Sequence, residues 1–123
     1  MNQITYQDVI NEYIRVGNVL QETYKNMDYK VGNKEGKKIV RVFKIMENDL
    51  ELAMKSLPEL FSSENEIVRV KAAASSIALG IFVKEAKAVL EEVGRVGNNI
   101  NSFNAKMTLE VWRKQRYLKV YPE

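Results

Sequence analysis

Two clusters of basic residues are the parts of this chain best suited to chemistry, and that chemistry is the binding of anions. The first cluster recurs at helical spacing and comprises Lys34, Lys37, Lys38, Arg41 and Lys44. Phosphate groups held by such a helix face would make binding strongly dependent on salt. The alternative is a solvated face whose charge is offset by the acidic segment 47–66, and the sequence leaves both interpretations open.

The second cluster mixes aromatic and basic side chains near the end of the chain. It comprises Trp112, Arg113, Lys114, Arg116, Tyr117, Lys119 and Tyr121. Aromatic residues interleaved with arginine are typical of protein interfaces and of platforms for nucleic-acid bases. The alternative is that Trp112 and Tyr117 only cap the last apolar layer. The candidate binding surface predicted from both clusters comprises Lys37, Lys38, Arg41, Lys44, Trp112, Arg113, Arg116 and Tyr117.

The residue types that the chain lacks argue against catalysis. Histidine and cysteine are both absent, which removes the commonest general base near neutral pH, thiolate nucleophiles, disulfides and most zinc sites. The carboxylates of Glu47, Asp49 and Glu51 are two residues apart, a spacing that scatters them around a helix. Ser75 and Ser76 lie in an apolar helix and are predicted to be packing residues. We therefore expect no enzyme, no cofactor and no metal site.

Length and charge fit one domain spanning residues 1–123. The net charge of +3 is unevenly placed, with +5 over residues 30–46 and −5 over residues 47–66. The longest weakly charged stretch, residues 72–83, is too short to span a bilayer. The first residues have no basic segment followed by an apolar run, so we expect no secretory signal and a cytoplasmic protein.

Apolar periodicity predicts helices, and no segment has the pattern of a paired strand. The predicted helices cover approximately residues 5–28, 37–56, 64–79, 84–93 and 104–115. Loops are expected at residues 31–36 and 94–101, because both contain Gly and Asn. The inward face of the second helix is expected to hold Ile39, Val42, Phe43, Met46, Leu50, Ala53 and Met54. The last helix is expected to carry the apolar residues Met107, Val111 and Trp112.

The helix at residues 64–79 has an apolar stripe on each of two faces, so it should be buried between neighbours. A capping box of Ser63 and Glu66 is predicted at its start, and Gly80 at its end. Within the first helix, Gly17 would allow a close helix contact. Stacked helical pairs explain this pattern better than a four-helix bundle, because the 64–79 helix needs cover on two sides.

Several short pieces in the middle of the chain resemble the HEAT-repeat pattern. They are Leu57-Pro58-Glu59-Leu60, Asn65, Val68-Arg69, Ala72-Ala73, Leu79-Gly80 and Ala88-Val89-Leu90. The resemblance implies an all-α superhelix of HEAT/armadillo-like helical pairs, with about five to six helices. It also implies that Asn65 and Arg69 take part in an internal ladder with a structural role.

The whole chain is also similar to a small bacterial family of unknown function with a HEAT-like fold. The matching pieces are residues 41–46, 68–74 and 104–109. This resemblance implies no catalytic residues. Some small helical-repeat proteins of this kind resemble immunity proteins of bacterial toxin systems.

We therefore predict a non-enzymatic protein-binding module that works through the shape and charge of a helical surface. An immunity or inhibitor role is one specific version of this function. The alternative is a nucleic-acid-binding helical-repeat protein that uses the basic helix face. The two hypotheses differ in where the cations lie in three dimensions, particularly whether Lys37, Arg41 and Lys44 share a concave face with Lys71 or Arg113.

Overall fold

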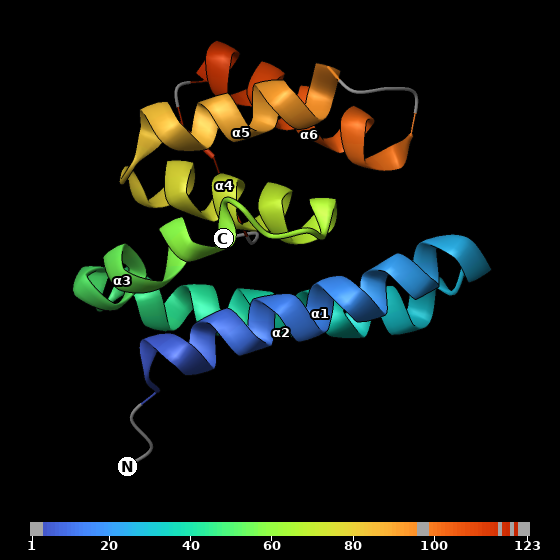
Figure 1. Ribbon diagram of the computed structural model, residues 1–123, viewed down its shortest axis with the longest axis horizontal. Helices are drawn as coiled ribbons and strands as arrows, with labels where there is room; N and C mark the ends of the chain where they lie inside the picture. The colour runs from blue at the N-terminus through green and yellow to red at the C-terminus, as the bar shows by residue number, and fades with distance from the viewer. Residues whose placement is uncertain (1–3, 96–98, 116, 119, 121–123) are drawn as a thin grey trace.

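The protein is all-α, as predicted (Figure 1). A computed structural model describes residues 4–95, 99–115, 117, 118 and 120. The helices within these residues are α1 (Tyr6–Asn26), α2 (Tyr29–Glu47), α3 (Leu50–Leu60), α4 (Glu66–Leu79), α5 (Val83–Arg95) and α6 (Ile100–Gln115). None of them is both long enough and apolar enough to cross a membrane.

The helices form a layered stack with α4 in its centre (Figure 1). On one side α4 packs against α1 and α3, and on the other side against α5 and α6. Each of its two apolar stripes packs into a different hydrophobic core, which confirms the prediction that this helix is buried between neighbours. Val68 and Ala72 belong to the core shared with α1, α2 and α3, whereas Ala73 and Ile77 belong to the core shared with α5 and α6.

The contact between α1 and α4 depends on Gly17, as the sequence predicted. A Cβ atom at this position would overlap with Cγ2 of Val68, which is fully buried. A second link joins the same helices, because the Tyr13 hydroxyl lies 2.8 Å from Oγ of Ser75. Ser75 and Ser76 are buried, in agreement with their predicted packing role.

Side-chain caps set the boundaries of the first and fourth helices. Thr5 and Asp8 form a reciprocal capping box at the start of α1. The capping box predicted for Ser63 and Glu66 is wrong, because the cap of α4 is Asn65. Its side-chain oxygen accepts from the backbone N–H groups of Ile67 (2.8 Å) and Val68 (3.4 Å). Gly80 ends the helix with a φ of 74°, as predicted.

The predicted bounds of the second helix are wrong at both ends. The segment 31–36, expected to be a loop, lies inside α2 because Asp28 caps a helix that begins at Tyr29. The predicted continuous helix from residue 37 to 56 is divided at residues 48–49, and Asp49 caps the new helix α3. Because of this break, the face of α3 that turns toward the core is not a continuation of the buried face of α2. Leu50 and Met54, expected inside, are therefore 46% and 50% exposed.

The last two helices are longer than predicted, and α6 packs inward through a face that was not predicted. Gly94 lies in α5 and Asn101 in α6 rather than in a loop, while the predicted loop residues Gly97 and Asn98 are outside the described residues. The inward face of α6 is made of Ser102, Ala105 and Leu109, with Trp112 partly buried against the same core. Met107 and Val111, two of the apolar residues expected on this helix, lie outside that face, and both side chains are exposed.

Candidate binding groove

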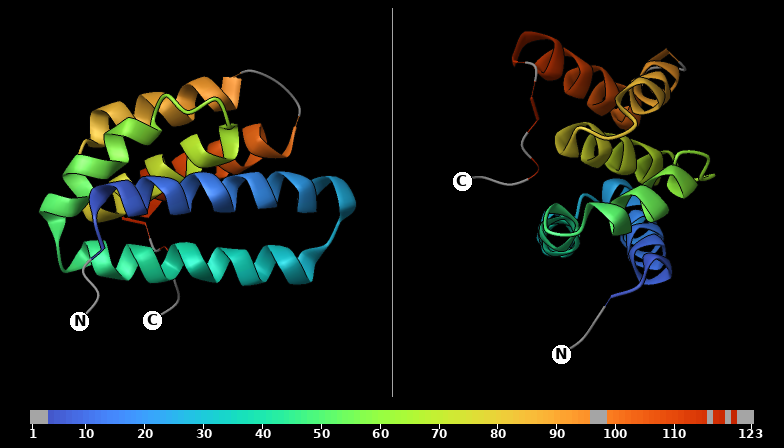
Figure 2. Two further views of the ribbon diagram at one scale, coloured as in Figure 1. Left: turned by 60° about the horizontal axis from the view of Figure 1, so that its bottom comes forward. Right: turned by 90° about the vertical axis from the view of Figure 1, so that its left-hand side faces the viewer.

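A groove runs along one side of the stack between α2 and α6, with α4 as its floor. Three adjoining hollows make up this groove, with volumes of about 410, 280 and 600 Å³. The described part of the C-terminal segment after α6 lies on the same side of the molecule (Figure 2). The hollow of about 410 Å³, called here the central hollow, is lined mainly by apolar side chains: Ile39, Val40, Ala74, Met107, Val111 and Leu118.

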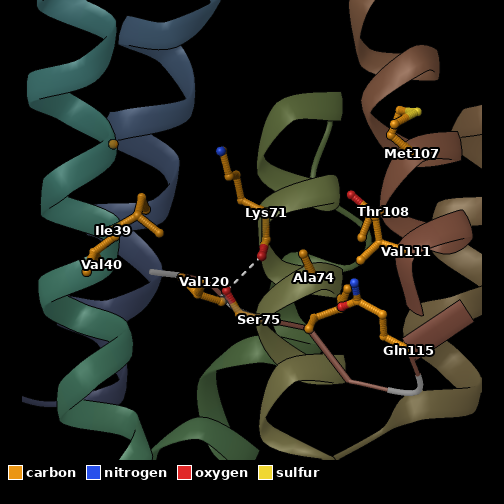
Figure 3. A pocket seen from close by; sticks show the side chains of 12 residues that line it. Ile39, Val40, Lys71, Ala74, Ser75, Met107, Thr108, Val111, Gln115 and Val120 are labelled. Atoms are coloured by element: carbon orange, nitrogen blue, oxygen red, sulfur yellow. Dashed lines mark hydrogen bonds between the residues drawn. The ribbon is translucent and has the colours of Figure 1, made fainter. Parts of the chain in front are cut away.

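Among the described residues, Lys71 alone lines all three hollows. It rises from α4 into the space between α2 and α6 (Figure 3). Its backbone carbonyl accepts a hydrogen bond of 2.8 Å from Oγ of Ser75. Within the described residues its ammonium group has neither an ion pair nor a hydrogen bond. Burial lowers the pKa of Lys71, because the charged form loses solvation.

The α6 rim of the groove carries a row of exposed apolar side chains. The row consists of Ile100, Phe103, Met107 and Val111. Met107 and Val111 line the central hollow, whereas Ile100 and Phe103 lie beside the groove and line none of its three hollows. The spacing of these residues places them on one helix face. Phe103 is the most exposed of them, at 61%. This row was not predicted from the sequence, because the spacing of Met107 and Val111 is also that of core residues.

The exposed face of α2 carries most of the predicted basic cluster, but only Lys37 of that cluster lines the groove. Lys34, Lys37, Arg41 and Lys44 are exposed on the side of α2 opposite its buried residues, and Lys30 extends the row by one turn. Lys37 lines the hollow of about 600 Å³ together with Lys71. Arg41 and Lys44 line none of the three hollows described above. Only part of the predicted basic cluster therefore meets Lys71.

Lys38 lies apart from that row and joins a charge network with α1. The carboxylate of Glu35 accepts from Lys38 and from Arg15, with oxygen–nitrogen distances of 3.2 Å in both ion pairs. Arg15 also pairs with Glu12. The hydrogen bonds from Arg15 hold the pKa of Glu35 below its ordinary value, and Lys38 adds to this effect. The acid that offsets part of the predicted cluster is therefore Glu35.

Replacing Glu35 with glutamine should make the free energy of unfolding less dependent on pH in the acidic range. The lowered pKa of Glu35 means that its carboxylate stabilises the fold above the ordinary pKa of glutamate, and that this contribution disappears as the pH falls through the lowered value. Urea unfolding at pH values between about 7 and 3 should show a difference between wild type and Glu35→Gln that shrinks toward acid. The exposed Glu59, changed to Gln, is the control. A difference that stays constant with pH would contradict this account.

The aromatic part of the predicted surface lies on α6 and just after it. Trp112 packs against the second core, which agrees with a capping role for this residue. Arg113 pairs with Glu91 of α5 at 3.3 Å, and Tyr117 is exposed. Arg116 lies outside the described residues. The described residues of the candidate surface are thus divided between α2 and the C-terminal end of α6 rather than gathered in one patch, and only Lys37 of them lines the groove.

Two of the three carboxylates at residues 47–51 have structural partners. Asp49 caps α3, and Glu51 pairs with Lys55 at 3.5 Å. Over the residues that the structure describes, no three acidic side chains come together as a metal site would require. Comparison of the chain with protein-family models, with curated proteins and with solved structures finds no match.

Proposed function

We propose that this protein is a non-enzymatic binding module that holds a helical segment of another protein along the groove between α2 and α6. The observation that carries the proposal is the row of exposed apolar side chains on the α6 rim. Ala105 and Leu109 already supply the inward face of α6, so the fold does not require Phe103 to be apolar. Clustered apolar side chains beside a concave surface are typical of protein interaction sites.

The charges along the groove indicate what kind of segment would fit. Lys37 of α2 lines the groove, the other cations of α2 are exposed on the same helix, and the floor carries Lys71. An amphipathic helix could place its apolar residues against the α6 rim and its acidic residues against the cations of α2. Such complementarity would set the orientation of the bound segment and speed its association.

We further propose that the stack is a HEAT-like array located in the cytoplasm, with an immunity or inhibitor role as the specific version of the binding function. The roles of two residues support the HEAT-like part of this proposal. Asn65 caps α4 and donates to the side-chain oxygens of Asn18 (3.1 Å) and Gln21 (3.3 Å) of α1. Arg69 donates to the carbonyl of Ser63 at 2.9 Å. These internal bonds are of the kind that the resemblance implies.

The binding function is tested by capturing partners with the tagged protein from a lysate of its native host, with and without nuclease. We expect a nuclease-resistant, stoichiometric protein partner whose capture is abolished by Phe103→Asp. The matched control is Met54→Asp, because Met54 is 50% exposed on α3, away from the groove. If both variants capture the same proteins as the wild type, the α6 rim is not the binding surface.

The alternative function, binding of nucleic acid, is favoured by the cationic row on α2. Lys34, Lys37 and Arg41 have no ion pair within the described residues, so their charge is available to phosphate groups. In the same capture experiment this function would yield nucleic acid that is lost at about 200 mM salt. Reversal of Lys37, Arg41 and Lys44 to glutamate would then abolish capture, whereas Phe103→Asp would leave it unchanged.

A further inference from the structure

We propose that the central hollow binds a small organic carboxylate with an apolar tail, of the medium-chain fatty acid type, and that Lys71 is its counter-ion. The hollow has a volume of about 410 Å³, which lies in the range of small-molecule binding sites. The hollow is part of the groove that the partner segment is proposed to use, and Met107 and Val111 belong to both. The two proposals can be tested separately, because Phe103 is not among the residues that line the hollow.

The position of Lys71 provides the first argument. It is the only charged residue among the described residues that line the central hollow. An ammonium group that loses solvation without gaining a partner destabilises a protein, and an anionic ligand would remove that cost. No buried side-chain nitrogen or oxygen in the described part of the chain lacks a partner, so the unpaired ammonium group still reaches solvent. A ligand that enters the groove can therefore meet it.

The walls of the hollow provide the second argument, because they define the rest of the ligand. Ile39 and Val40 of α2 face Met107 and Val111 of α6 across the hollow (Figure 3). Most of the polar groups are already committed: the Thr108 hydroxyl donates to the carbonyl of Asn104 at 2.8 Å, and the Ser75 hydroxyl is engaged with Tyr13 and Lys71. A ligand with many polar groups would lose hydrogen bonds with water and gain few in return. An alkyl tail loses none.

The charge of the site favours a carboxylate over a phosphate. One ammonium group balances one negative charge, whereas a phosphate monoester carries nearly two at neutral pH. Phosphate sites usually add arginine side chains or backbone N–H groups at a helix N-terminus. Lys71 lies in the interior of α4, and no arginine is among the described residues that line the hollow.

The test is a calorimetric titration of the full-length protein with decanoate and with 1-decanol, which has the same alkyl chain without the charge. We expect decanoate to bind wild type at least about tenfold more tightly than decanol, as a charge-assisted contact predicts. Lys71→Met keeps the apolar stem of the side chain and should bring the two affinities together. Lys84→Met removes an exposed lysine of α5 and should leave the preference intact.

A second variant keeps the proposal testable if Lys71→Met does not fold. Val111 lies at the edge of the hollow and is partly exposed, so Val111→Phe should fill the hollow and weaken the binding of both compounds. Methyl NMR spectra should show decanoate-induced shifts at Ile39, Val40 and Met107. Equal affinities of decanoate and decanol for wild type, an unchanged preference in Lys71→Met, or shifts confined to other parts of the protein would overturn the proposal.

Discussion

Replacing Gly17 with valine should lower the free energy of unfolding by about 3 kcal/mol. The added Cβ would overlap with Cγ2 of Val68, which has no free space to move into because it is fully buried between α1 and α4. The two helices would have to separate, and the hydrogen bond between Tyr13 and Ser75 connects the same pair. Urea unfolding measured by circular dichroism would give the size of the effect.

The control for this prediction is Gly36→Val, the same substitution in another helix. A Cβ atom at Gly36 has no neighbour within 4 Å, so this variant should change the stability by less than about 0.5 kcal/mol. Combining Gly17→Val with Val68→Ala should recover part of the lost stability, because the second change removes the overlapping methyl groups. Equal effects at Gly17 and Gly36 would mean that helix preference, rather than close approach, determines the result.

Replacing Leu90 with alanine should also lower the free energy of unfolding by about 2–5 kcal/mol. Leu90 of α5 is 0% exposed and belongs to the core shared by α4, α5 and α6. Truncation removes apolar contacts and leaves a cavity that these helices cannot fully close. Leu50→Ala is the matched control, because Leu50 is 46% exposed and its loss should cost less than about 0.5 kcal/mol. Similar losses in the two variants would show that α5 is not packed as described.

The fold was predictable where the residues of a single helix carry the needed information, such as which faces are apolar and where the helix ends. The two apolar stripes of α4 predicted that it has neighbours on two sides, and Gly80 predicted its end. The boundary between α2 and α3 was not predictable from periodicity, because the apolar pattern continues through residues 48–49 while the backbone does not. Asp28 and Asp49 were the available signals, since aspartate is a favoured N-cap residue, but a cap is informative only when its helix is already known.

The candidate site was less predictable than the fold because it depends on the gap between helices. The exposed cations of α2 are evident in the sequence, since charged residues at helical spacing usually face solvent. The apolar row on α6 is not, because Met107 and Val111 have the same spacing as core residues. The sequence nevertheless contained a signal for this row. Ala105 and Leu109 give α6 a second apolar face, and a helix at the end of the stack can bury only one of its two faces. Nothing in the sequence near Lys71 predicts that its side chain lies in an open space between α2 and α6.

The placement of α4 between two cores has a consequence for how the chain can be divided. A fragment that ends at Leu79 would expose Val70, Ala73 and Ile77, and a fragment that begins at Glu66 would expose Val68 and Ala72. Each fragment would expose apolar residues that the whole chain buries. The chain should therefore fold as one cooperative unit rather than as separable modules. Amide hydrogens throughout α4 should then exchange only through global unfolding, which makes this helix the slowest-exchanging part of the molecule.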